Sequence, residues 1–107
     1  MAFFLKQGDL LPSIQAQLLD TSGVPVDLTG VLGVNFCFRR RNNTDVTTAA
    51  ATIVDATNGV VQYDWVAGDT DAVGEYEAEW VVTFASGKEQ TFPSEGFNEF
   101  EVTEDLC

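Results

Sequence analysis

The sequence predicts an all-β protein, an antiparallel β-sandwich of about seven to eight strands. Apolar residues recur at every second position along most of the chain, and no window shows the i, i+3, i+4, i+7 spacing of an amphipathic helix. Turn signals rich in Gly, Asn, Asp and Pro separate the alternating segments at short intervals. Because the chain has 107 residues and no linker, we expect residues 1–107 to form a single domain with one core.

The first half of the chain is expected to provide three main strands. Residues 3–7 form an opening strand, and a second strand follows over residues 13–18. A Thr-Ser-Gly turn separates it from a short segment over residues 26–28. A long strand comes next, with Cys37 on one face and four apolar residues on the other: Leu32, Val34, Phe36 and Phe38.

The second half alternates between apolar and polar residues more regularly. Residues 46–54 form one alternating segment, and Asn58-Gly59 then marks a tight hairpin, since Asn and Gly tolerate positive φ. A strand over residues 60–66 follows. The clearest alternation covers residues 75–84, where three glutamates occupy one face and apolar residues the other. Two more strands are expected, over residues 89–92 and 97–103.

The hydrophobic core is expected to consist of the apolar residues that share the inward faces of these strands. Large aromatic side chains dominate this set, and each of them buries a large apolar area. The predicted core residues are Leu18, Val34, Phe36, Phe38, Ile53, Tyr63, Trp65, Tyr76, Ala78, Trp80 and Val82.

The loop over residues 68–75 has two interpretations. Asp69 and Asp71 stand two apart, as in a calcium loop, but Val73 and Trp80 occupy positions where oxygen ligands are expected. An acidic turn, a glycine and then Tyr76 entering an alternating strand are typical of a tyrosine corner, in which the tyrosine hydroxyl bonds to the backbone of the preceding loop. We therefore favour an Ig-like sandwich and expect no metal.

Two cysteines are present, and a disulfide between them is not expected. Cys107 is the last residue of the sequence, and Cys37 lies within a predicted strand. Ala78 stands two residues after the tyrosine, where antibody domains have the second cysteine of their bridge between the sheets. Cys37 is therefore expected to be a reduced thiol, and the core to hold without a disulfide.

The net charge of −12 is distributed unevenly along the sequence. The first 63 residues carry five acids and four bases, whereas the last 44 carry twelve acids and one base. Such a field repels nucleic acid and anionic membranes, so neither is an expected partner. No signal peptide and no transmembrane segment is recognisable, which indicates synthesis in the host cytoplasm without secretion.

The absence of histidine excludes histidine-based acid–base and nucleophilic catalysis, as well as histidine-containing zinc sites. No catalytic residue and no cofactor is expected. A carbohydrate-binding or adhesion module is the alternative, because Trp65 and Trp80 could stack on sugars. Both tryptophans, however, belong to the predicted core. An exposed aromatic platform would be the feature that favours this alternative.

Several stretches, read in order, resemble a known family. They are Phe4-Leu5-Lys6-Gln7-Gly8-Asp9, Pro12, Gly23-Val24-Pro25-Val26-Asp27-Leu28-Thr29-Gly30, Phe36-Cys37-Phe38-Arg39, Gly59-Val60-Val61-Gln62-Tyr63-Asp64-Trp65, Asp69-Thr70, Gly74-Glu75-Tyr76-Glu77-Ala78-Glu79-Trp80 and Thr91-Phe92-Pro93. This pattern resembles the Ig-like domain at the N-terminus of phage baseplate upper proteins, the BppU-type domain. The resemblance extends from about Phe3 to about Val102.

The resemblance implies a non-enzymatic structural protein of a bacteriophage virion that binds other virion proteins and has no catalytic residues. Because the sequence ends at Cys107, without the further segments of the baseplate proteins, we expect a free-standing accessory subunit. Its position could be capsid decoration, neck, tail or baseplate. A homo-oligomer and a regulatory protein outside the particle are also open.

The attaching surface is expected on the less charged part of the chain. Phe3 and Phe4 point in opposite directions on an extended strand, so that one can pack inward while the other contacts a neighbour. Arg39 and Arg41 lie at the end of the long strand, share a face and belong to the only basic cluster. The candidate protein-binding residues are therefore Phe3, Phe4, Arg39 and Arg41.

Overall fold

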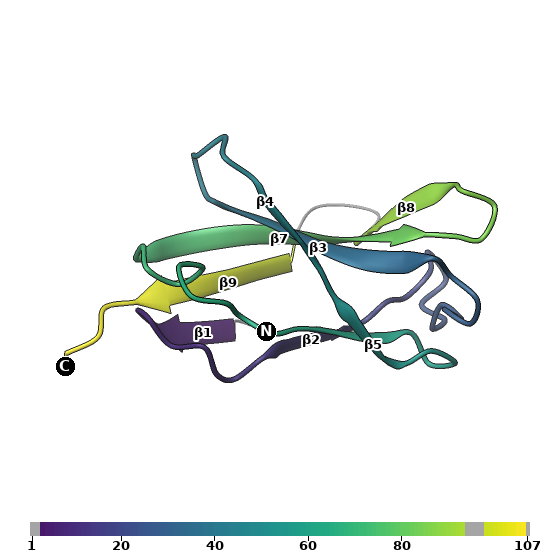
Figure 1. The fold of residues 1–107 in the computed structure, drawn as a ribbon, viewed down its shortest axis with the longest axis horizontal. Coiled ribbons are helices and arrows are strands. Elements are labelled where there is room, and N and C mark those ends of the chain that lie inside the picture. The colour runs from purple at the N-terminus through teal and green to yellow at the C-terminus, as the bar shows by residue number, and fades with distance from the viewer. Residues whose placement is uncertain (1–2, 94–97, 107) are drawn as a thin grey trace.

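Strands form where β-branched and aromatic residues alternate with polar ones, and they build two sheets packed face to face (Figure 1). The computed structural model describes residues 3–93 and 98–106. Within these residues the predicted all-β sandwich is confirmed. Its nine strands are β1 Phe3–Lys6, β2 Ile14–Gln17, β3 Gly33–Arg40, β4 Thr47–Ala50, β5 Thr52–Asp55, β6 Val60–Tyr63, β7 Gly74–Thr83, β8 Glu89–Phe92 and β9 Asn98–Thr103.

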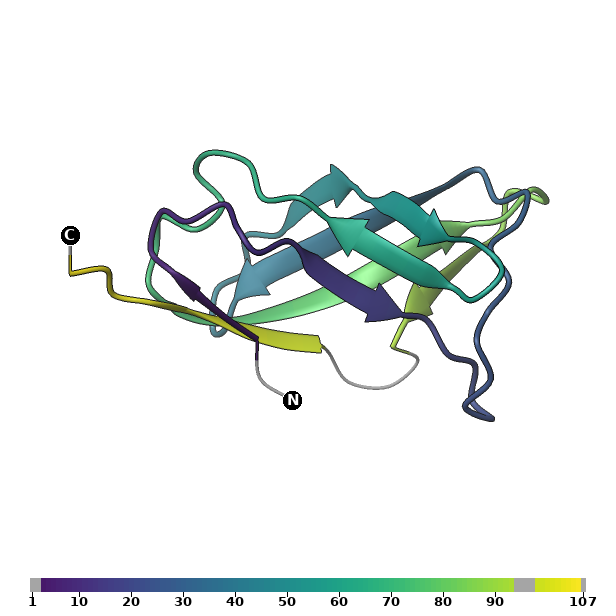
Figure 2. The same ribbon diagram turned by 90° about the horizontal axis from the view of Figure 1, so that it is seen from below.

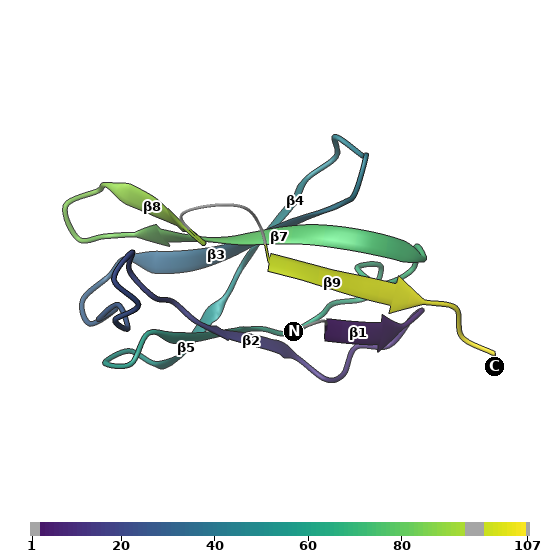
Figure 3. The ribbon, with the colours of Figure 1, turned by 180° about the vertical axis from the view of Figure 1, so that it is seen from behind.

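The large sheet is organised around β7. This ten-residue strand pairs with β3 along one side and with both β9 and β8 along the other. β4 forms the edge beyond β3, and β1 forms the edge beyond β9. The pairing of β1 with β9 is parallel, with Phe3 opposite Phe100 and Lys6 opposite Thr103 (Figures 1 and 3). All other named strand pairs in the described residues are antiparallel, as predicted.

The small sheet consists of β2, β6 and β5 and covers the large sheet (Figure 2). A single residue, Ala51, joins β4 of the large sheet to β5 of the small sheet. Its N–H donates to the carbonyl oxygen of Val34 at 2.8 Å, whereas Ile53, two residues later, lies opposite Val61 in the other sheet. The chain therefore passes directly from one layer to the other along this side of the sandwich.

The predicted hairpin turn at Asn58-Gly59 is confirmed between β5 and β6. Gly59 has φ of +67°, a conformation that favours glycine. It is also buried, and a Cβ atom there would lie only 2.6 Å from the carbonyl oxygen of Val26. This position therefore needs glycine both for its backbone conformation and for space.

The core lies between the two sheets and is rich in aromatic rings. The Phe36 ring of β3 lies 4.5 Å from Trp80 and 4.9 Å from Tyr63, measured between ring centroids, so it links the two layers. All predicted core residues are buried except Ile53, which is partly buried. The prediction missed seven other buried apolar residues: Leu5, Ile14, Leu28, Val61, Phe92, Phe100 and Val102.

Three strand predictions need correction. Leu32 precedes β3 and is 69% exposed, so it does not share the buried face of that strand. Residues 46–54 form two strands in different sheets, divided at Ala51. The strand predicted over residues 60–66 ends at Tyr63.

Candidate interaction surface

The outer face of the large sheet carries most of the charged strand residues. Glu75, Glu77 and Glu79 alternate along β7, and the strand register places Glu101 of β9 opposite Glu75 and Glu99 opposite Glu77. Like charges directly opposite one another on neighbouring strands destabilise a sheet unless cations lie between them. The local structure of this face therefore depends on its arginines.

Arg39 and Arg41 extend from the end of β3 into this row of glutamates. The Arg39 guanidinium lies 3.3 Å from a carboxylate oxygen of Glu77. Arg41 contacts three carboxylates, with N–O distances of 3.0 Å to Glu75, 3.6 Å to Glu77 and 3.1 Å to Glu99. The two arginines predicted to bind a partner thus also neutralise the glutamates of their own sheet.

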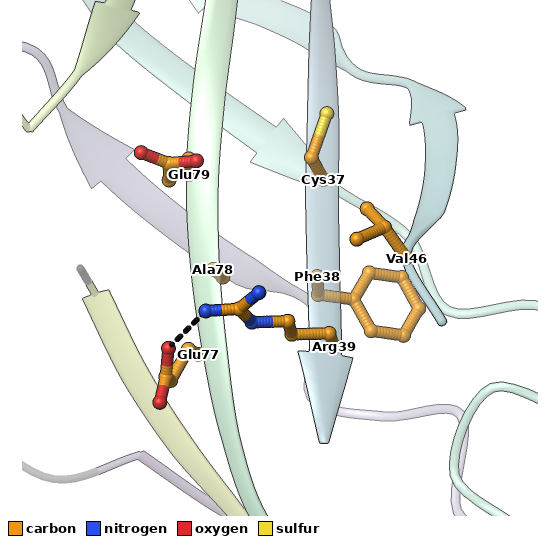
Figure 4. A pocket seen from close by; sticks show the side chains of 7 residues that line it. All are labelled: Cys37, Phe38, Arg39, Val46, Glu77, Ala78 and Glu79. Atoms are coloured by element: carbon orange, nitrogen blue, oxygen red, sulfur yellow. Dashed lines mark hydrogen bonds and ion pairs between the residues drawn. The ribbon is translucent and has the colours of Figure 1, made fainter. Parts of the chain in front are cut away.

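A shallow pocket of about 310 Å³ lies on the same outer face, between β3, β7 and the start of β4. In Figure 4 Arg39 crosses β7 toward Glu77, and Cys37 and Glu79 lie further along β3 and β7. Cys37 is half-buried and free, in agreement with the predicted reduced thiol, whereas Cys107 lies outside the described residues. Glu79 forms no ion pair with any cation in the described part of the chain.

Phe3 and Phe4 point to opposite faces of β1, as predicted. Phe3 is half-buried, and its ring lies 6.4 Å from that of Trp65. Phe4 is 58% exposed and lies beside Glu101 in the strand register. The structure therefore brings Phe4 to the same outer face as Arg39 and Arg41 and directs Phe3 toward the core.

The loop between β6 and β7 has the predicted tyrosine corner. The Tyr76 hydroxyl donates to the carbonyl oxygen of Ala72 at 2.6 Å. Asp69 accepts hydrogen bonds from the Tyr63 hydroxyl at 2.6 Å and from the Val66 N–H at 3.0 Å. Burial, then the bond to Asp69 and its charge, raise the pKa of Tyr63, and burial also raises the pKa of Tyr76.

The outer face of the small sheet is formed mainly by amides and hydroxyl groups. Gln15 of β2 donates to Gln62 of β6 at 2.6 Å, and Gln62 donates to Asp64 at 2.7 Å. Ser13 donates to the same Asp64 oxygen at 2.6 Å. These two hydrogen bonds, with Ser13 the stronger cause, lower the pKa of Asp64 because they favour its charged form.

Three further features bear on function. Trp65 and Trp80 are both buried, so neither can stack on a sugar as it stands. In residues 3–93 and 98–106 no three cysteine, aspartate or glutamate side chains gather as a metal site would require. The same residues include no helix long and apolar enough to span a membrane.

A family model described as the BppU N-terminal domain matches residues 5–106. The chain belongs to this family. The match covers nearly the whole sequence and confirms the resemblance found in its motifs. A search of the curated proteins finds no match.

Membership of the BppU N-terminal domain family identifies the chain as a phage structural domain of the kind found in baseplate proteins. This is consistent with a sandwich whose most distinctive surfaces are a charged sheet face and unpaired strand edges. What the sequence did not reveal is that Phe4, Arg39 and Arg41 share a face with the glutamates of β7 and β9.

Proposed function

We propose that this chain is a small, non-enzymatic, Ig-like structural subunit of a phage virion that binds other virion proteins. The family match over residues 5–106 carries the proposal. A baseplate or tail position agrees best with the family, and capsid decoration or a neck position are further sites to which such a subunit could attach. The absence of histidine and the burial of both tryptophans support a binding role over catalysis or sugar recognition.

The attachment surface is proposed to include Phe4, Arg39 and Arg41, with Phe3 supporting it from the inner side of β1. Phe4 is a large exposed apolar side chain on an edge strand, which is a common feature of contact surfaces. The arginines hold a geometry fixed by Glu75, Glu77 and Glu99, and a preorganised surface loses less conformational entropy on binding.

The test of the function is a mass-spectrometric inventory of purified particles from the phage or prophage that encodes the chain. We expect the chain to be present at a copy number that matches the symmetry of the component carrying it. Its absence from particles, while it accumulates in the infected cell, would contradict a virion role and favour a regulatory one.

The test of the surface is incorporation of the Phe4→Ser variant and of the double variant Arg39→Gln with Arg41→Gln. Point substitutions are preferred to a truncation of the first strand, because removing residues 1–5 would also remove the buried core residue Leu5. Each variant should melt cooperatively and yet enter particles less well than the wild type. The matched control is Val54→Ser, which changes an exposed apolar residue on the other sheet.

A further inference from the structure

The edge strands of the two sheets differ in how well they are protected against pairing with another chain. Exposed edges are usually protected by charged residues, prolines or bulges. Three edge strands have such protection. β1 contains the charged Lys6, and β8 begins at the charged Glu89. β5 has a register irregularity between Ile53 and Asp55, and Asp55 is itself charged. β4 reads Thr-Thr-Ala-Ala and has no charge, no proline and no bulge.

The unpaired side of β4 presents backbone hydrogen-bonding groups. In the β3–β4 pair the N–H of Ala51 donates to Val34, which fixes the alternation of bonds along the strand. Thr47 and Ala49 therefore bond toward β3, while Thr48 and Ala50 direct their N–H and C=O groups away from it. β4 is the last strand on its side of the sheet, and in Figure 1 it rises away from β7 and β8.

We propose that β4 is an attachment strand of this domain, to which a basic extended segment of a different virion subunit adds as a further strand of the large sheet. This inference rests on the proposed function and adds a second contact, at the edge of the large sheet opposite to β1 and Phe4. Strand addition draws affinity from backbone hydrogen bonds and specificity from side chains on alternate positions. The outward N–H and C=O groups of Thr48 and Ala50 supply the backbone hydrogen bonds.

The charge of the outer face defines the specificity. It carries five glutamates of β7 and β9 against Arg39 and Arg41, and Glu79 faces the pocket next to β4 without a cationic partner in the described residues. Alternate side chains of an added strand project on the same side as Thr48 and Cys37, toward this field. Lysine or arginine at those positions complements it.

The same charge argues against a second copy as the occupant. Two β4 strands paired antiparallel about a two-fold axis would place both outer faces on one side of a continuous sheet. That arrangement brings two acidic faces together, and each chain has a net charge of −12. A different, basic subunit is the occupant that the electrostatics favour.

The experiment measures copies per purified particle for backbone variants of the edge. Thr48→Pro removes one outward N–H and leaves the bonds to β3, since proline is compatible with the outer side of an edge strand. Thr48→Lys keeps the backbone and introduces a protecting charge, so it covers the case in which the proline variant does not fold. We expect each folded variant to lose about tenfold in copy number.

Two matched controls separate the edge from general effects. Thr48→Val keeps the N–H and the β propensity and should enter particles like the wild type. Gln15 of β2 also directs its N–H outward, because Leu18 bonds to Gly59 in that pair, so Gln15→Pro tests the other uncharged edge. Loss with Gln15→Pro but not with the Thr48 variants would overturn the assignment to β4.

Partner charge is tested with Glu79→Lys and Glu104→Lys, which change the net charge equally. Only Glu79→Lys should reduce the copy number, and equal losses would contradict a local basic contact.

Sedimentation of the purified wild type should show a monomer, and a dimer abolished by Thr48→Pro would make a second copy the occupant. If the wild type is absent from particles, the proposed function fails; if it is present and Thr48→Pro and Thr48→Lys enter equally well, only this inference fails.

Discussion

The outer faces of the two sheets are stabilised by different interactions. On the large sheet, glutamates of β7 and β9 stand opposite one another and are bridged by Arg39 and Arg41. On the small sheet, Gln15, Gln62 and Ser13 form a chain of neutral donors that ends on Asp64. The first network should weaken with salt, whereas the second should respond mainly to pH.

This difference shows why charge counted along the sequence does not give the charge of a surface. The nearly neutral first 63 residues supply Arg39 and Arg41, and the acidic last 44 supply the glutamates beside them. Because β3 and β7 are neighbours, the two parts of the sequence meet on one face. The expected separation of an acidic side from a nearly neutral attaching side is therefore not present on the large sheet.

The largest effect should come from the core that both faces cover. Trp80→Ala removes a fully buried indole from β7 and should lower the free energy of unfolding by about 3–5 kcal/mol. Trp80→Phe is the control, because the Trp80 Nε1–H has no hydrogen-bond partner in the described residues and its loss costs little. Urea unfolding measures both. If a variant on either outer face lowered the free energy of unfolding as much as Trp80→Ala, the core would not be the main source of stability.

The next effect concerns Tyr63, at the end of the small sheet. The pKa of Tyr63 is raised in the folded state. Its contribution to the free energy of unfolding is therefore complete below the unfolded pKa of about 10 and is lost as the pH rises toward the folded pKa. Tyr63→Phe should cost about 1–2 kcal/mol at neutral pH, and the difference from the wild type should shrink in alkali. Tyr76 titrates in both proteins and cancels. A difference that grows above about pH 10 would contradict this assignment.

A smaller effect should separate the large sheet from the small one. Replacing Arg39 and Arg41 together with glutamine leaves the facing glutamates without cations and should cost about 1 kcal/mol at low salt, given that both side chains are partly exposed. The loss should shrink at about 1 M NaCl. The control is Gln15→Ala with Gln62→Ala, whose cost should not depend on salt. Identical salt dependence of the two double variants would show that the faces do not differ.

The smallest effect is expected from Asp64 on the small sheet. Its lowered pKa means that it stabilises the fold above its unfolded pKa and loses this contribution as pH falls through the folded value. When the pH is lowered from about 6 to about 3, the unfolding midpoint should therefore fall more in the wild type than in Asp64→Asn. Asp45→Asn, on the β3–β4 loop, should behave like the wild type. Equal acid sensitivity of wild type and Asp64→Asn would rule out the hydrogen-bonded carboxylate as the cause.

Most of the strands could be predicted because alternation reports which side of a strand is buried. Along β7 the glutamates and the buried Tyr76, Ala78 and Trp80 alternate without interruption, and the prediction was correct there. The tyrosine corner was also predictable, because its signature is local and the bond from Tyr76 reaches back only to Ala72. Local patterns of this kind need no knowledge of the partner strand.

The features that could not be predicted depend on which strands are neighbours. Residues 46–54 keep their alternation through Ala51, so the sequence does not show that β4 and β5 belong to different sheets. In the same way, nothing near Arg41 indicates that Glu75 and Glu99 will surround it. Of the candidate surface, the opposite directions of Phe3 and Phe4 followed from their own strand. The exposure of Phe4 rather than Phe3, and the environment of the arginines, required the topology.

The parallel pairing of β1 with β9 determines how the domain responds to mechanical force. If Phe3 and Thr103 are pulled in opposite directions, the two strands slide along each other, and the load is shared by the bonds of the pair. The Gln7 N–H bond to Thr103 at 2.8 Å and the Thr103 hydroxyl bond to Leu5 extend this ladder. Forced unfolding depends on the height of the unfolding barrier. A shearing geometry opposes rupture more strongly than one in which bonds open in sequence.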